Sequence, residues 1–180
     1  KLKKIVWPLW LSIGDEAGKT LFAELGADPA TFVLADTGAM AALQDKLIKI
    51  TQINDYTREA VRETLTEGMS KVETVSQLQD RVRETFNFTE SRSLTIARTE
   101  TGQAAGVARD AAMGELGVEE VEWSTAGDSV VRDSHADLDG DTVKRGEPFK
   151  NGLLYPCDPA GDPESVINCR CVGIPVVAKE

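Results

Sequence analysis

NFTESRSLTIARTETGQAAGVARDAAMGELG, residues 87–117, is the stretch that decides the fold. It predicts one long helix, because Thr89 can cap its start and Gly117 can end it. Small residues dominate the face that we expect to point inward, namely Ala97, Gly102, Ala105, Gly106 and Ala112. Glycine inside a helix costs roughly 1 kcal/mol relative to alanine. We therefore expect another part of the backbone to pack very closely against this face.

Shorter helical segments precede the long helix. Apolar residues recur at helical spacing over residues 13–26, 37–50, 53–70 and 74–86. Gly26 is the expected C-cap of the first segment, and Pro29 suits the first turn of a short helix after it. Thr74 or Ser76 can cap the last segment. The first half of the chain is therefore predicted to be helical.

The pattern changes after Gly117. Residues 118–125, VEEVEWST, alternate as a strand does, and residues 127–164 are rich in Gly, Pro and Asp. Residues 165–177, SVINCRCVGIPVV, are predicted to form a last strand. Helices followed by strands indicate an α+β fold. We expect a helical arm over 1–72, and over 73–180 a small domain in which the long helix packs on a short, loop-rich β-sheet.

Composition narrows the classes of function. The 180 residues are 41% hydrophobic, which is enough for a packed core, and the net charge is −10. So acidic a chain repels a phosphate backbone, so we expect at most incidental contact with DNA. No apolar run approaches the roughly 20 residues that a membrane span needs. We therefore expect a protein without a membrane span.

The sequence suggests two familiar motifs whose residues do not fit, and it lacks a third. GDEAGKT, residues 14–20, has three residues between its glycines where a phosphate-binding loop has four. HADLDGDTVKRGE, residues 135–147, lacks the acidic residues that a calcium loop needs at its first and last positions. A serine nucleophile elbow, Gly-x-Ser-x-Gly, does not occur. The first two stretches are better interpreted as a helix surface and an Asp-Gly turn.

The cysteines and the single histidine remain as a candidate site once these motifs are excluded. In a strand, Cys169 and Cys171 would face the same side, and His135 and Cys157 lie in the loop-rich stretch upstream. Together the four residues make a Cys3His set, which suits tetrahedral zinc. Two alternatives stay open, namely packed thiols and a disulfide from Cys157 to Cys169 or Cys171. A zinc ion is the one cofactor that we consider.

A second group consists of polar residues in otherwise apolar elements. Its members are predicted to tie the long helix to the last strand: Arg98, Glu100, Arg132, Asn168 and Arg170. The rival interpretation is an enzyme site for a phosphate substrate, as in a small nuclease or a toxin, built from His135, Arg132, Glu100 and Arg170. A catalytic His135 would have to line an open cleft, whereas a structural one would be buried.

Three stretches in order carry a resemblance: IARTETGQAAGVARDAA, EWSTAGDSVVRDSHADLDGDTV and GEPFKNGLLYPCDPAGDPESVINCRC. Over roughly residues 55–176 the chain resembles the phage Mu F-like head morphogenesis family, the minor capsid proteins of tailed phages. The matching positions are Arg98, Thr99, Glu100, Trp123, Arg132, His135, Leu138, Gly140, Pro156, Asp158, Asn168, Cys169, Arg170 and Cys171. Cys157 is not part of the pattern, so a zinc site could need Asp158 or water as its fourth ligand.

The resemblance implies a structural protein of the virion rather than an enzyme. Members of the family lie inside the head near the portal, take part in head assembly in the host cytoplasm, and can leave with the DNA. The expected partners are the portal protein and other head proteins, with the helical arm as the docking segment. No small-molecule substrate is expected.

Overall fold

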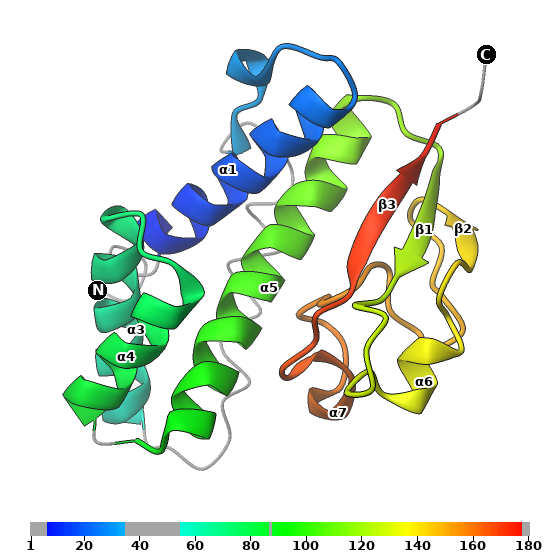
Figure 1. Cartoon of the computed structure of the whole chain (residues 1–180). Helices are drawn as coiled ribbons and strands as arrows, with labels where there is room; N and C mark the ends of the chain where they lie inside the picture. The colour runs from blue at the N-terminus through cyan, green and yellow to red at the C-terminus, as the bar shows by residue number, and fades with distance from the viewer. Residues whose placement is uncertain (1–6, 35–54, 87, 178–180) are drawn as a thin grey trace.

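Helix α5 (Glu90–Glu115) separates a helical part of the chain from a β unit. The structure is a computed structural model that describes residues 7–34, 55–86 and 88–177. On one side of α5 lie α1 (Trp7–Glu24), η2 (Pro29–Thr31), α3 (Asp55–Ser70) and α4 (Val75–Phe86). The β unit contains β1 (Glu120–Ser124), α6 (Asp133–Ala136), β2 (Thr142–Lys144), α7 (Pro163–Val166) and β3 (Val172–Val176). Figure 1 shows this arrangement, which confirms the α+β prediction.

The helices begin and end where local chemistry predicts. The Thr89 hydroxyl accepts a bond from the Arg92 N–H at the start of α5. Before α4, Thr74 and Gln77 bond each other's backbone N–H groups, as in a capping box. Gly26 follows α1 with a positive φ of 75°, and Gly117 follows α5 with a positive φ of 67°. The segment predicted over 37–50 lies outside the described residues.

Helix α1 contains the glycines of the rejected phosphate-loop motif. A Cβ at Gly14 would lie 2.3 Å from Leu34 and 3.2 Å from Ala108, and one at Gly18 would lie 2.0 Å from the Phe32 ring. Leu34 and Phe32 are buried at 0% and 2% exposure. The lack of a side chain at these glycines makes room for Phe32 and Leu34, which follow η2. Residues 14–20 therefore belong to a helix and do not form a phosphate loop.

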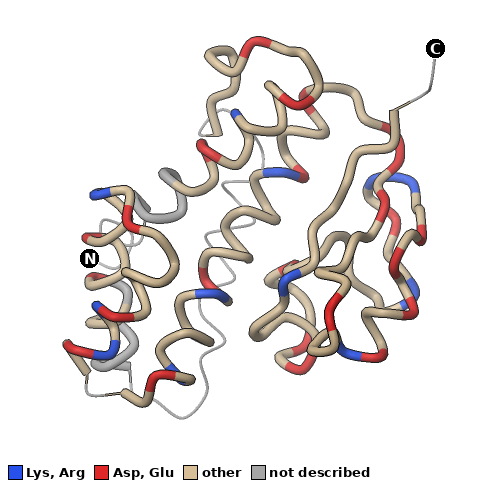
Figure 2. Tube along the Cα trace, in the orientation of Figure 1, with Lys and Arg blue, Asp and Glu red and all other residues tan. Residues whose placement is uncertain are grey.

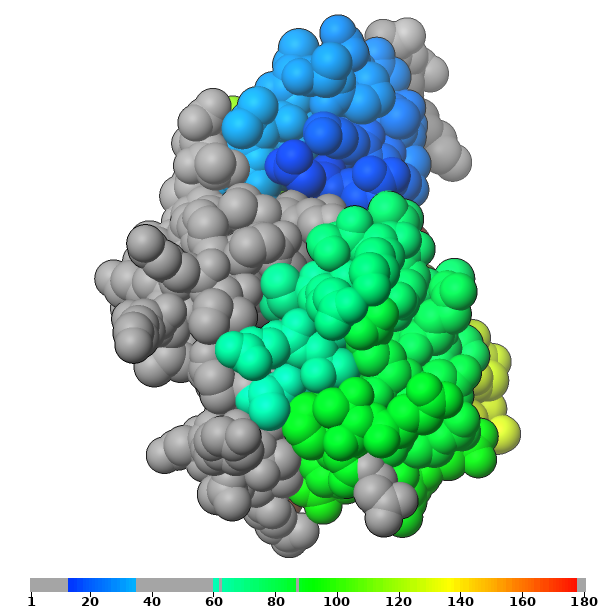
Figure 3. All heavy atoms as spheres, turned by 90° about the vertical axis from the view of Figure 1, so that its left-hand side faces the viewer, coloured from blue at the N-terminus to red at the C-terminus, as the bar shows by residue number. Residues whose placement is uncertain are grey.

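The apolar stripes of the helical part are covered within the described residues. Leu21 on α1, Val61 and Leu65 on α3, and Leu78 on α4 are all at most 1% exposed. They belong to the same core cluster as residues of α5, and Figure 3 shows α1 lying against α3. The stripes on α1 and α3, which we expected to dock on a partner, are thus buried inside the protein in the part of the chain that the structure describes. The division at residue 72 stays a prediction.

The small face of α5 has the close neighbour that was predicted. A Cβ at Gly106 would lie 2.8 Å from the Pro156 carbonyl oxygen, and one at Gly102 would lie 3.1 Å from the Cys157 sulfur. The loop that contains residues 155–157 therefore approaches the helix more closely than any residue with a side chain would permit.

The sheet has the order β2-β1-β3, and both pairings are antiparallel. Its hydrophobic centre is Trp123 on β1, which is 0% exposed. The Trp123 ring meets Phe149 and His135 edge to face, at centroid distances of 5.1 and 5.2 Å. The turn-rich stretch also contains helix α6, strand β2 and the start of helix α7, which the sequence pattern did not predict.

The last strand is shorter than predicted. Strand β3 begins at Val172, whereas Ser165 and Val166 belong to α7. Asn168, which lies between α7 and β3, has a positive φ of 58°. Cys169 and Cys171 therefore lie in the loop before the strand, so the prediction that strand alternation aligns them was wrong.

Charged residues are distributed in a way that fits the acidic composition. Figure 2 shows Lys and Arg singly or in pairs among Asp and Glu along the described trace. Several of the basic side chains are paired, such as Arg81 with Glu73 and Arg109 with Glu24. None of the described helices is long and apolar enough to cross a membrane.

Candidate metal centre

His135 is held in the β unit by helix α6 and by the aromatic core. It lies in the last turn of this four-residue helix and is 1% exposed. Arg132, the N-cap of α6, donates from Nη2 to the Ile167 carbonyl. That bond joins α6 to the segment just before Cys169. The Trp123 ring packs against the imidazole at 75° and fixes its plane.

The two cysteines are held in place from α5. Asn168, immediately before them, donates its backbone N–H to Thr99 Oγ1 at 2.9 Å. Its side-chain oxygen accepts from Arg98 Nη1 at 2.8 Å. These two bonds hold Asn168 in the left-handed conformation, which asparagine adopts more readily than most residues. The turn at Asn168 directs the chain so that Cys169 and Cys171 both face His135.

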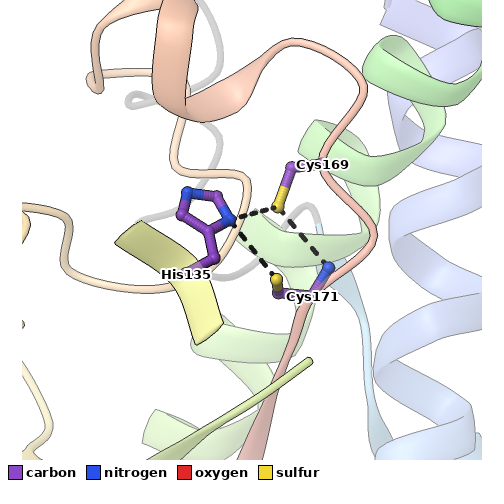
Figure 4. A group of neighbouring side chains, drawn as sticks. All are labelled: His135, Cys169 and Cys171. Atoms are coloured by element: carbon purple, nitrogen blue, oxygen red, sulfur yellow. Dashed lines mark hydrogen bonds between the residues drawn. The ribbon is translucent and has the colours of Figure 1, made fainter. Parts of the chain in front are cut away.

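Three ligand atoms converge as a result. His135 Nδ1 lies 3.4 Å from Cys171 Sγ and 3.7 Å from Cys169 Sγ, as Figure 4 shows. The Cys171 N–H also lies 3.5 Å from Cys169 Sγ. All three ligand atoms are within 4.8 Å of one another, and all three residues are buried. Imidazole nitrogen with thiolate sulfur is a donor set typical of zinc sites.

The sulfurs influence one another's ionisation. Hydrogen bonds from Cys157 and from Cys171 lower the pKa of the Cys169 thiol. The same bonds raise the pKa of Cys157 and of Cys171, and burial raises both further. Mutual hydrogen bonding of this kind favours one thiolate within the group, and the thiolate is the form that binds metals.

Cys157 lies beside this group but not in it. Its Sγ is 3.8 Å from the Cys169 carbonyl oxygen and 4.0 Å from that of Cys171. It is buried against Gly102 of α5 and has a positive φ of 64°. The structure thus brings together three of the four predicted ligands. All three cysteines of the chain, each within the described residues, are free thiols.

Asp158, the other side chain considered as a fourth ligand, is engaged in its own loop. Its two carboxylate oxygens accept from the backbone N–H groups of Ala160 and Leu154, at 2.8 and 3.4 Å. The Asp137–Asp139 part of the rejected calcium motif is likewise turn structure, since Asp139 accepts from the Thr125 N–H at 2.7 Å. The His135 group is therefore the set that suits a metal ion in the part of the chain described here.

The polar residues near the centre bind protein groups. Arg98 and Asn168 tie α5 to the cysteine loop, as expected, and Glu100 is buried in α5 at 2% exposure. Arg170, which we expected to bind α5, pairs instead with both oxygens of Asp128 in the segment after β1. That pairing lowers the pKa of Asp128 to about 2.

This geometry does not assemble the enzyme site considered as the alternative. His135 is buried, and Arg132 and Arg170 are engaged by a carbonyl and a carboxylate. A phosphate substrate would need these groups to converge on an open cleft. Asp128 was not predicted from the sequence, because its role depends on a contact with Arg170 across 42 residues of chain.

A family match covers the part of the chain that contains the site. A family model described as "Phage Mu protein F like protein" matches residues 59–174. An uncharacterized protein of Haemophilus influenzae is 29% identical over 168 residues, which cover 92% of this chain and 34% of that protein. The uncharacterized protein YqbB of Bacillus subtilis is 27% identical over 140 residues, which cover 73% of this chain and 45% of YqbB. The chain thus spans less than half the length of either relative, and no solved structure matches it.

Proposed function

The chain belongs to the phage Mu protein F-like family, and on this premise we propose that it is a structural protein of a tailed-phage head. It acts in head morphogenesis, lies inside the capsid beside the portal, and can leave with the DNA. The observation that carries the proposal is the family match, which runs from α3 to β3 and includes all of α5 and the β unit.

The charge of the chain supports contact with proteins rather than a grip on DNA. The net charge is −10, and the basic residues of the described part are interspersed with acidic ones. Proteins that grip DNA without sequence preference instead gather Lys and Arg on one face. We therefore infer that the portal and other head proteins are the partners, and that any contact with DNA is incidental.

The buried site supports a structural rather than an enzymatic role. His135 is 1% exposed, and its neighbours Trp123, Cys169 and Cys171 are buried as well. A general acid or base must reach the proton that it transfers, directly or through one water. In this arrangement the imidazole holds α6 to the cysteine loop, which is what a structural residue does.

Purified phage heads test the proposal. Heads from a phage that encodes this chain would be treated with a protease before and after disruption, with the chain followed by mass spectrometry. We expect the chain to be protected in intact heads, cleaved in disrupted ones, and crosslinked to the portal protein. The major capsid protein, as the control, should crosslink mainly to itself. Ejection triggered in vitro would show whether the chain leaves with the DNA.

Two results would contradict the proposal. Absence of the chain from both immature and mature heads would rule out a stable place in the virion. Cleavage at equal rates in intact and disrupted heads would place it on the outer surface instead.

A further inference from the structure

We propose that His135 Nδ1, Cys169 Sγ and Cys171 Sγ bind one Zn²⁺, which has a structural role. The three atoms lie within 4.8 Å of one another on buried residues. This inference does not depend on the proposed role in the phage head, because it rests on the geometry of the β unit alone. The fourth coordination position belongs to a water molecule, and Cys157 is a supporting residue rather than a ligand.

The spacing of the ligand atoms matches tetrahedral coordination. With Zn–S of about 2.3 Å and Zn–N of about 2.0–2.1 Å, tetrahedral angles place the nitrogen and a sulfur roughly 3.5–3.6 Å apart. The two measured distances, 3.4 and 3.7 Å, lie on either side of this value. Both nitrogen–sulfur distances are therefore those of a tetrahedral zinc site.

A bound ion also explains why a polar ring is buried here. The Nε2 atom of His135 has no hydrogen-bond partner among the described residues. Nδ1 faces only sulfur atoms, and sulfur is a weak donor and a weak acceptor. Burying Nδ1 with such poor partners is unfavourable, whereas a zinc–nitrogen bond compensates for the loss of water at this atom. Two thiolates also neutralise the charge of Zn²⁺, so that the buried site is neutral as a whole.

The structure provides room for the fourth ligand next to His135. A cavity of about 10 Å³ is lined by His135, Cys171, Asn168 and Arg132, among others, which is the space of about one water molecule. Neither Cys169 nor Cys157 lines this cavity. The Cys157 thiol faces the carbonyl oxygens of Cys169 and Cys171 and supports the loop from the side of α5.

The ion would connect parts of the chain that are far apart in sequence. His135 is 34 residues from Cys169 and 36 from Cys171. The cysteine loop is joined to α5 through Asn168, Thr99 and Arg98. Zinc at this point therefore holds α6, the loop before β3 and the long helix in one unit, and its binding is coupled to folding of the β unit.

Metal analysis of the full chain tests the proposal. The protein would be purified under reducing conditions without chelator and measured by elemental mass spectrometry. We expect about one zinc per chain, as for a single tetrahedral site. Replacement of the zinc by Co²⁺ should give the absorption of a tetrahedral site with thiolate-to-cobalt charge transfer. This spectrum needs no variant, so the test does not depend on whether a variant folds.

The three cysteines offer a matched set of variants. C169S and C171S, together with H135A, should each weaken zinc binding by more than about tenfold in competition with a chelator. C157S, a change of the same kind at a buried cysteine of the same unit, should keep one zinc per chain. Its charge-transfer intensity per cobalt should equal that of the unchanged protein, because both contain two thiolate ligands.

Two outcomes would overturn the assignment. A wild-type protein that holds no stoichiometric zinc, and takes none up on titration, would show that the group is a set of packed thiols. A fall of about one third in the charge-transfer intensity per cobalt of C157S would show that Cys157 is a ligand. Either result leaves the proposed role in the head untouched, and failure of that role would not affect the metal content.

Discussion

Replacing Gly106 by alanine should destabilise the protein, whereas the same replacement at Gly114 in the same helix should stabilise it. Both glycines are helical residues of α5, and neither has a positive φ. They differ in what a new methyl group would meet. At Gly106 it would lie 2.8 Å from the Pro156 carbonyl oxygen, which is backbone. At Gly114 it would lie 2.8 Å from the guanidinium of Arg145, which is the movable end of a long side chain.

The two energies can be compared term by term. Alanine is favoured over glycine inside a helix by about 0.8–1.0 kcal/mol. Forcing a methyl group into a closely packed contact costs about 1–3 kcal/mol. The net effect of G106A is therefore a loss of roughly 1 kcal/mol. G114A should gain about 0.5–1 kcal/mol, because Arg145 can move and its surface pair with Asp110 contributes little.

Thermal and urea unfolding, followed by circular dichroism, measure this difference. A separation of about 2 kcal/mol between the two variants corresponds to roughly 4–8 °C in Tm for a chain of this size. G102A should fall between them, because its methyl group would meet the Cys157 sulfur at 3.1 Å. If G106A proves as stable as G114A, the loop of residues 155–157 does not approach α5 as closely as described, and the explanation of the small helix face fails.

Three further changes have expected outcomes. G18A would place a methyl group 2.0 Å from the buried Phe32 ring and should cost about 2–3 kcal/mol in urea unfolding; a neutral effect would mean that α1 and the segment after η2 are packed differently. N168A should lower the free energy of unfolding by about 2 kcal/mol, because it removes the hydrogen bond to Arg98 and alanine disfavours the positive φ. N168G should lower it by about 1 kcal/mol, because glycine tolerates that φ. Equal losses would refute the role of the turn. The pKa of Asp128 is lowered from 3.8 to about 2 by Arg170, so its contribution to stability is fully present above pH 3.8 and is lost as the pH falls through 2. Unfolding midpoints of the wild type and D128N should therefore converge between pH 4 and pH 2 at matched metal content, and a constant gap would contradict the ion pair.

Local chemistry explains which parts of the fold could be predicted. Helix boundaries at Thr74, Thr89 and Gly117 depend on hydrogen bonds or on φ values within a few residues of the position concerned. The small face of α5 also revealed that a neighbour must approach closely, since glycines within a helix carry a cost that packing has to offset. Neither observation required knowledge of distant parts of the chain.

The candidate site shows where such inference ends. The types of its residues, one histidine and three cysteines, were evident as a metal-ligating set. Which three converge was not evident, because the left-handed turn at Asn168 is held by Thr99 and Arg98, about 70 residues earlier in the chain. Strand alternation was expected to point Cys169 and Cys171 to the same side. They do face the same group, but both precede β3, so the loop and not the strand aligns them.

The sequence by itself therefore determined that helices precede strands, the acidic and non-membrane character expected of the chain, and the resemblance to its family. These properties follow from composition, periodicity and the spacing of motifs. Only the tertiary structure decided that the apolar stripes of α1, α3 and α4 are buried, that Arg170 pairs with Asp128, and that Cys157 lies beside the His135 group rather than in it. The physical reason is that a contact between residues far apart in sequence depends on how whole elements pack, and here that packing is set by the close approach of the β unit to α5.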